Sequence, residues 1–193
     1  MLVSETYSIQ DCLFYDNASS DKTSNYNITN ASLSFDTDHY QSIASSTSST
    51  SNYFAFVNPK ASLGLPRNLE VELDIKQTGN LTGQWGVSFT DSQGKTTSTK
   101  YATCGAFTNQ KGIICNSPWG AQRTDGTLSL NTWYHMKITI NSTTVSLELK
   151  QGDTTLFNDS LVVSFMSSLT YLNIHQGQSS NTVQFKNLKV KAL

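Results

Sequence analysis

The chain has 193 residues, and its 13 Lys and Arg residues nearly balance its 14 Asp and Glu residues to give a formal net charge of −1. This balance argues against a nucleic-acid surface, which is usually clearly basic, and against a polybasic membrane patch. No apolar run approaches the length of about 18 residues that a membrane-spanning helix needs, so we expect no membrane insertion.

The length suits one all-β domain over residues 1–193. Only 14% of the residues are charged, so most of the polar surface must come from Ser, Thr, Asn and Gln, as is common in extracellular and virion β-proteins. The opening segment MLVSETYSIQ has neither the basic nor the apolar region of a signal peptide. We therefore expect either a piece of a longer exported chain or a protein that leaves the cell by another route, such as phage lysis.

Alternating apolar and polar residues, which are typical of β-strands, recur along the chain, whereas helical periodicity is nearly absent. In residues 69–76 the aliphatic side chains occupy the odd positions and the charged ones the even positions, and residues 85–89 follow a similar pattern. Further strands are expected, in chain order, at 10–15, 32–35, 38–44, 52–58, 111–116, 169–177 and 182–193. About a dozen short strands with turns roughly every 8 to 12 residues indicate a β-sandwich or barrel.

The clearest pattern is a hairpin over residues 134–149, in which apolar residues alternate with polar ones in both halves. A two-residue turn at Asn141–Ser142 would pair Ile138 with Val145, and every apolar residue would then face an apolar partner. In the last strand the apolar residues change from odd to even positions, which predicts a β-bulge near Lys186–Asn187.

The three cysteines are odd in number and form no CxxC motif, which disfavours a zinc site and a disulfide framework. A tight two-residue turn would place Cys104 opposite Cys115 across a hairpin, whereas a turn that ends in a bulge at Gly112 would oppose Cys115 to Phe107. The second turn fits better because glycine accepts a left-handed conformation. We therefore favour reduced thiols, Cys12 included.

The chain resembles concanavalin A-like lectin/glucanase domains, which include laminin-G-like modules, in four segments. Its hairpin LSLNTWYHMKITINSTTVSLEL is similar to a family hairpin that opens on a Trp-Tyr or Trp-His pair. The segments LPRNLEVELDIKQ and GQWGVSFTDSQGK resemble central strands, VQFKNLKVKAL resembles the final strand, and DCLFYDNASSDKTSNY resembles the opening strand that pairs with it. The resemblance covers nearly the whole chain and implies an all-β, two-sheet antiparallel jelly-roll sandwich that often binds carbohydrate.

A catalytic function is disfavoured by the one carboxylate cluster that resembles a catalytic strand. Some glucanases of this fold carry a Glu-x-Asp-x-(x)-Glu motif, whose side chains share a face and act as nucleophile and acid. Here Glu70, Glu72 and Asp74 share a face, but the third motif position falls on Lys76 or Gln77, neither of which can exchange a proton as needed. A G-x-S-x-G elbow and a phosphate loop are also absent, so we assign no catalytic residues.

Calcium is the ion that the resemblance implies most often, although no cofactor is required by the sequence. Asp36 and Asp38 lie between two expected strands, and Asp16 and Asp21 lie in an early loop. Calcium needs about six to eight oxygen ligands. Aspartates in turns more often bond their own backbone, so Asp36 and Asp38 stay weak calcium candidates.

An aromatic platform is the strongest candidate for a ligand site, because the apolar faces of sugars stack on Trp and Tyr while their hydroxyls bond polar side chains. Trp85 and Trp133 belong to strand patterns, so we expect them to be structural. Trp119, in the turn-rich segment CNSPWGAQRTDG, has no strand register and could either stack on a sugar or cover the edge of the sandwich. The polar or aromatic residues expected around it are Asn116, Gln122, Arg123 and Asp125, with Tyr101 and Asn109 from the preceding hairpin.

The function that these features favour is non-catalytic binding of a cell-surface glycan or polysaccharide by an adhesin or a viral tail protein. We expect such a module outside the cell, at the cell surface or in a virion. Two alternatives are a glycoside hydrolase-like enzyme of the same fold and a structural module that assembles a fibre, for example as a homotrimer within a longer chain.

Overall fold

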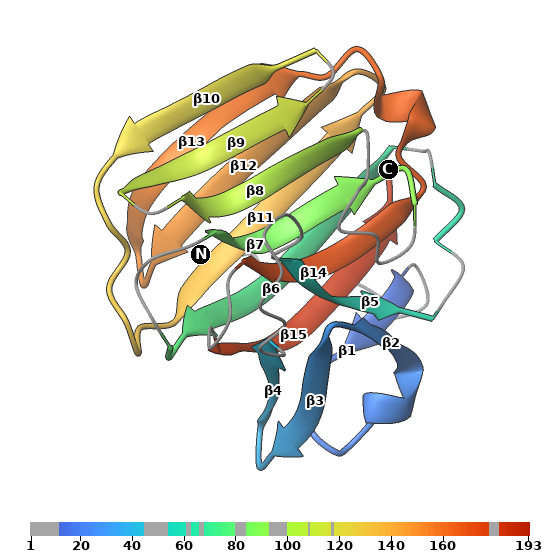
Figure 1. The fold of residues 1–193 in the computed structure, drawn as a ribbon, viewed down its shortest axis with the longest axis vertical. Coiled ribbons are helices and arrows are strands. Elements are labelled where there is room, and N and C mark those ends of the chain that lie inside the picture. Colours follow the sequence, from blue (N-terminus) through green and yellow to red (C-terminus); the bar gives the residue numbers. More distant parts are fainter. Residues whose placement is uncertain are drawn as a thin grey trace, which may run out of the picture.

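Two antiparallel β-sheets pack face to face in the computed structural model of the chain (Figure 1). The structure describes residues 12–44, 54–60, 63–65, 68–79, 84–92, 100–107, 109–116, 118–177 and 182–193. Sheet A contains, in spatial order, β13 (Thr154–Val162), β12 (Thr144–Gln151), β11 (Tyr134–Asn141), β6 (Leu69–Gln77), β15 (Thr182–Ala192), β4 (His39–Ala44) and β3 (Ala31–Asp36), and β1 (Cys12–Asp16) pairs with the other half of β15.

Sheet B forms the second layer of the sandwich. It contains, in spatial order, β10 (Gly120–Asp125), β9 (Gln110–Asn116), β8 (Tyr101–Phe107), β7 (Gln84–Thr90), β14 (Tyr171–Gly177), β5 (Phe54–Pro59) and β2 (Tyr26–Thr29). Short 3-10 helices, η2 (Thr23–Asn25) and η3 (Met166–Ser168), interrupt the loops. Among the described residues no helix is long and apolar enough to cross a membrane.

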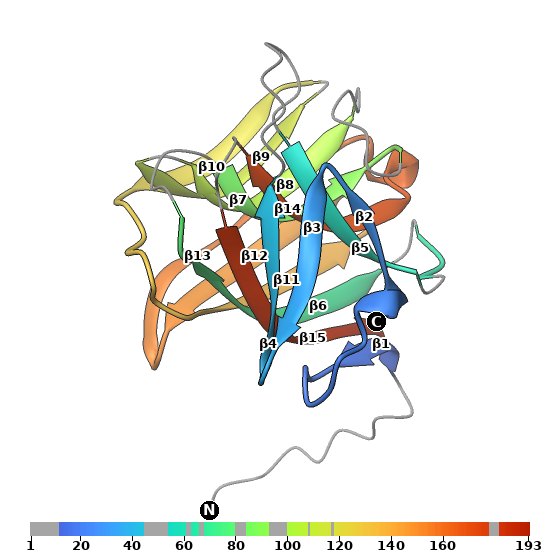
Figure 2. The same ribbon diagram turned by 60° about the horizontal axis from the view of Figure 1, so that its bottom comes forward.

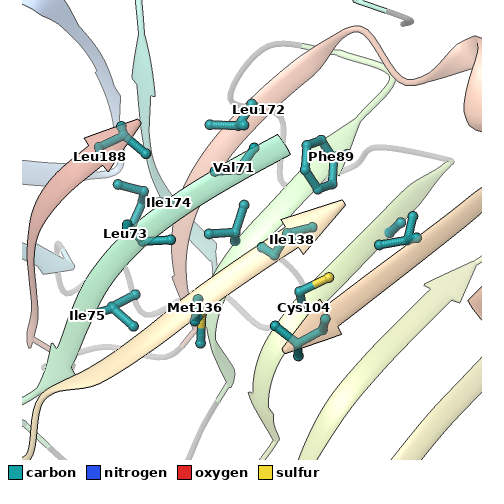
Figure 3. Close-up of a cluster of buried hydrophobic side chains, with 14 of the residues drawn as sticks. Val71, Leu73, Ile75, Phe89, Cys104, Met136, Ile138, Leu172, Ile174 and Leu188 are labelled. Atoms are coloured by element: carbon teal, nitrogen blue, oxygen red, sulfur yellow. The ribbon is translucent and has the colours of Figure 1, made fainter. Parts of the chain in front are cut away.

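The core lies between the sheets and follows the predicted alternation. On β6 the residues Val71, Leu73 and Ile75 are fully buried and face residues such as Phe89 and Ile174 of sheet B (Figure 3). Because alternate side chains of a strand point to opposite faces, the charged residues of β6 lie on the outer face of sheet A. Trp85 is only 2% exposed, which confirms its predicted structural role.

The predicted hairpin and bulge are both present, although the hairpin register is wrong by two residues. Ile138 pairs with Leu147 instead of Val145, because the turn consists of Ser142 and Thr143. Ser142 has a left-handed φ of 48°, and its N–H donates to the side-chain oxygen of Asn68 at 2.8 Å. A shift of two residues leaves the same side chains inside, so the sequence pattern does not distinguish the two registers.

The predicted bulge in β15 is confirmed between Lys186 and Lys189, where the register against β6 shifts. Asn187 adopts a left-handed φ of 54° there. The bulge keeps the apolar residues of both halves of the strand in the core, since Phe185 and Leu188 are fully buried.

The register of the β8–β9 hairpin differs from both predicted alternatives. Phe107 pairs with Gln110 and Cys104 pairs with Ile113, so the cysteines are not opposite each other. Gly112 lies inside β9, opposite Gly105, rather than in the turn. All three cysteines are free, which confirms the predicted thiols.

The segment 120–125, predicted as part of a loop, forms the edge strand β10 of sheet B. It lies against β13, the edge strand of sheet A, and the two strands close one side of the sandwich. The Gln122 side-chain amide donates to the Asp159 carboxylate across this seam. The strands β2 and β13 were also not predicted, because neither shows a clear apolar alternation.

Candidate functional site

The carboxylates that resemble a catalytic strand form an ion-pair ladder on the outer face of sheet A. Glu70 contacts Lys137 and Lys191, with nitrogen–oxygen distances of 2.9 Å each, and Glu72 lies 3.5 Å from Lys137. Although burial opposes ionisation, the hydrogen bonds from Lys137 and Lys191 lower the pKa of Glu70. A carboxylate held ionised in this way cannot serve as a general acid, which needs a raised pKa.

Asp74 is paired as well. His135 Nδ1 lies 2.9 Å from one carboxylate oxygen, and the Asn187 amide donates to the other at 2.6 Å. Burial opposes ionisation, but these two contacts lower the pKa of Asp74, and the hydrogen bond to Asp74 raises the pKa of His135. The outer face of β6 is therefore a cross-strand network of paired charges.

The weak calcium candidates Asp36 and Asp38 lie at the β3–β4 turn, and the side chains of Lys186 and His39 contact Asp38. The carboxylate of Asp38 accepts a hydrogen bond from Lys186 at 2.8 Å and contacts His39 at 2.9 Å. Hydrogen bonding to Lys186 and then to His39 lowers the pKa of Asp38 to about 2. The Asp36 carboxylate accepts a hydrogen bond from the Thr37 hydroxyl at 3.0 Å, a side-chain contact instead of the expected bond to its own backbone. Within the described ranges no group of three or more His, Cys, Asp or Glu side chains could hold a metal ion.

Asp16, which was expected in an early loop, lies at the end of β1, and its contacts are structural. Its carboxylate is 1% exposed and accepts hydrogen bonds from the hydroxyls of Tyr26 at 3.0 Å and Tyr40 at 2.9 Å. The Ala18 N–H donates to its other oxygen at 2.9 Å. Asp16 thus ties β1 to β2 and β4 instead of facing a ligand.

A row of three glycines crosses the outer face of sheet B. Gly86, Gly105 and Gly112 are direct partners on β7, β8 and β9, with φ between 148° and 152°. A Cβ atom on any of them would lie 2.1–2.2 Å from a carbonyl oxygen of the adjacent strand. His175 of β14 and Arg123 of β10 continue the row on either side. Only glycine permits this conformation and spacing, and it leaves the middle of the row without side chains.

An open depression of about 490 Å³ lies on the same face, two residue pairs further along these strands. Gln84, Phe107, Gln110 and Asp125 form a continuous line of cross-strand partners from β7 to β10. The Phe107 ring is 6% exposed, and the Gln110 amide donates to Asp125 Oδ1 at 2.9 Å. The lining residues of the depression are Gln84, Phe107, Asn109, Gln110, Arg123 and Asp125. This set offers amide groups, a guanidinium and a carboxylate, which together suit a polyhydroxylated ligand.

The structure divides the predicted Trp119 site into two groups. Tyr101 and Asn116 are direct partners, and Trp119 follows in the next turn with 61% of its surface exposed. Arg123 and Asp125 line the depression instead. Asn116 lies four residues along β9 from Gly112, the partner of Arg123, which corresponds to about 14 Å along the strand.

Gln122 faces the other way and bonds Asp159 of sheet A. Asn109, expected on the same side as Trp119, lies in the depression at the far end of the hairpin. Gln84, Phe107 and Gln110 were not predicted, and no alternation in the sequence marks them. Only the cross-strand register brings them together.

No protein-family profile matches the sequence, and no curated protein is similar to it in sequence. Solved structures are similar across nearly the whole chain. Basic winged bean lectin with Tn-antigen matches with a TM-score of 0.64 and 10% identity, over 92% of this chain and 96% of the lectin. The chain has the concanavalin A-like lectin/glucanase fold.

Two carbohydrate-binding modules share this concanavalin A-like fold. The module CBM66 from Bacillus subtilis matches with a TM-score of 0.59 and 15% identity, over 87% of this chain and 96% of the module. The CBM2 module of the evolved Dit of Lactobacillus casei BL23 phage J-1 matches with a TM-score of 0.56 and 12% identity, over 93% of this chain and 94% of that one. Such identities establish the shared fold, so the binding chemistry has to come from this chain's own surface.

Proposed function

We propose that this concanavalin A-like sandwich is a non-catalytic carbohydrate-binding module that recognises a cell-surface glycan or polysaccharide. The observation that carries the proposal is the depression on sheet B, where Phe107, Arg123 and Asp125 converge from neighbouring strands. The names of the similar lectin and carbohydrate-binding modules support it. We also propose that residues 1–193 form one module.

The lining residues have complementary roles in this proposal. The Arg123 guanidinium donates to ring hydroxyls of the sugar. Asp125, already oriented by Gln110, accepts from a neighbouring hydroxyl. A hydrogen bond to a charged group contributes about 1.5–3 kcal/mol, which corresponds to roughly a tenfold to hundredfold change in affinity.

We infer a second contact for longer glycans at the opposite ends of the same strands. There Trp119 is exposed beside the Tyr101–Asn116 pair. Since about 14 Å separates this group from Arg123, one sugar ring cannot reach both, whereas a chain that runs along β8–β10 can.

We do not propose that the depression hydrolyses glycans, because glycosidases use a pair of carboxylates about 5–10 Å apart. Asp125 is the single carboxylate among the described residues that line the depression. The three carboxylates of β6 lie on the outer face of the other sheet and are paired with lysines or His135.

We further propose that the module acts in an adhesin or in a viral tail protein, outside the cell or in the virion. The low fraction of charged residues and the similarity to a module of a phage Dit support this placement.

A glycan array tests the proposal. We expect the wild type to bind at least one glycan and Arg123→Ala and Asp125→Ala to lose that binding by roughly tenfold or more. Lys150→Ala and Glu148→Ala are matched controls on the outer face of sheet A and should bind like the wild type. Trp119→Ala should weaken only longer glycans. The proposal is overturned if the wild type binds no glycan or if the two depression variants bind normally.

A further inference from the structure

One lysine on the outer face of sheet A has no carboxylate partner among the described residues. Figure 2 shows the strands of this face, β11, β6 and β15, in the layer opposite to β8–β10. The other lysines of the face are each ion-paired with a carboxylate, namely Lys137, Lys150, Lys186, Lys189 and Lys191. Lys76 instead places its ammonium 4.5 Å from the centroid of the Trp133 ring.

The Trp133 ring gathers two ammonium groups. Tyr134 and Ile75 are cross-strand partners that point into the core, so the residues beside them, Trp133 and Lys76, point outwards. Lys186 of β15 also lies over the ring, with its Nζ 4.8 Å from the centroid. Two like charges at one ring repel each other unless carboxylates compensate them.

The carboxylates close to this ring are already held by other groups. Asp38 accepts a hydrogen bond from Lys186 at 2.8 Å, and Asp74 contacts His135 Nδ1 at 2.9 Å. The hydrogen bond to Asp74 raises the pKa of His135 above 6.5, so at about pH 6 the ring of His135 is protonated and compensates Asp74. The charge of Lys76 is then left without a counter-charge at this end of the sheet.

The surroundings of Lys76 indicate what kind of anion fits. Trp133 and Lys76 are both partly exposed, so an indole surface and an ammonium are presented side by side. The row continues across the sheet from Lys76 to Gln184 and then to Gln41, which accepts a hydrogen bond from the Gln184 amide at 2.9 Å. An anionic group attached to a ring with C–H faces and hydroxyls matches this combination of charge, aromatic surface and amides.

We propose that Lys76, Trp133 and Gln41, which we call the Lys76 site, bind an acidic saccharide through its sulfate or carboxylate group. The anionic group accepts from the Lys76 ammonium, the sugar ring lies against the indole of Trp133, and a hydroxyl accepts from the Gln41 amide. The Lys76 site shares no residue with the depression on sheet B, so it stands or fails independently of the proposed glycan site.

NMR titrations at about pH 6 with glucose 6-sulfate, glucuronic acid and glucose test the proposal. We expect the indole N–H of Trp133 and the amide of Lys76 to shift with the two acids and not with glucose. The two acids distinguish a sulfate from a carboxylate ligand. Lys76→Gln should weaken the binding of the acids about tenfold, because it removes one charge-assisted hydrogen bond.

Lys150→Gln is the matched control. It removes the same charge from the same face, but Lys150 is already paired with Glu148, so this variant should bind the acids like the wild type. Trp133→Leu should weaken binding, and if it fails to fold, the two lysine variants still decide. Arg123→Ala, which disables the depression, should leave these titrations unchanged.

Three results would each overturn the proposal. An equal loss in Lys76→Gln and Lys150→Gln would show that the acids respond only to the overall charge of the face. An equal response to glucose would remove the role of the anionic group. The absence of shifts at Trp133 and Lys76 with both acids would show that no ligand binds there.

Discussion

Gly105 lies at the centre of the glycine row, and its replacement by alanine is a strong test of the packing that shapes sheet B. An added Cβ would lie 2.1 Å from the Trp85 carbonyl oxygen and 2.9 Å from the Cα of Gly86, both backbone atoms of the adjacent strand. To accommodate it, β7 and β8 would have to separate along part of their ladder. The φ of 152° adds strain that a residue with a side chain rarely tolerates.

The expected loss of stability follows from these two effects. A sparsely populated backbone conformation costs about 1–3 kcal/mol, and overpacking costs typically about 1–3 kcal/mol. We therefore expect Gly105→Ala to lower the free energy of unfolding by about 4 kcal/mol, measured by urea denaturation. Gly152→Ala is the matched control, because Gly152 has a φ of 55° but no heavy atom within 4 Å of its added Cβ. Equal stabilities of the two variants would refute the steric role of the glycine row.

Three other predictions concern single side chains. The pKa of the Asp38 carboxyl is lowered to about 2 by hydrogen bonds from Lys186 and then His39, and in Lys186→Gln it should rise towards the ordinary value of 3.8 without reaching it, as measured by NMR, because the His39 contact remains. Burial lowers the pKa of His175 from 6.5 to about 3, so only the unfolded chain is protonated between these values. Stability should therefore fall as the pH drops through this window, and His175→Gln should show a weaker dependence in urea titrations at several pH values. Asn58→Val removes an unpaired buried oxygen and should leave the free energy of unfolding unchanged or raise it by about 1 kcal/mol, whereas a clear loss would show that the oxygen has a structural partner.

The sheets could be predicted wherever one face of a strand is apolar and the other is charged. The strand β6 is the clearest example, because Val71 and Leu73 alternate with Glu70 and Glu72. The same rule located the bulge near Asn187, since burial of both halves of β15 requires one extra residue. Burial thus determines which residues form strands and which face turns inward.

Strand registers and edge strands could not be predicted in the same way. A two-residue shift in the β11–β12 hairpin exchanges the partner of Ile138 without moving any apolar residue to the surface. The edge strand β10 reads GAQRTD and has no apolar alternation, because its inward residue Gln122 bonds Asp159 instead of entering an apolar core.

The candidate site depends on these unpredicted features. Sequence reasoning selected Arg123 and Asp125 but grouped them with Trp119, which lies at the other end of the strands. Their neighbours Gln84 and Phe107 become visible only once the register across β7–β10 is known. That register places Gly105 opposite Gly86 and Gly112, a close approach that a residue pattern alone does not specify.

The most direct test of the central claim is a crystal structure of the protein with the best-binding glycan from the array. We predict a sugar ring in the depression, with hydroxyl groups bonded to Arg123 and Asp125, and an unchanged backbone in β7–β10. Glycan density confined to the outer face of sheet A, or to the Trp119 turn with the depression empty, would contradict the proposed glycan site.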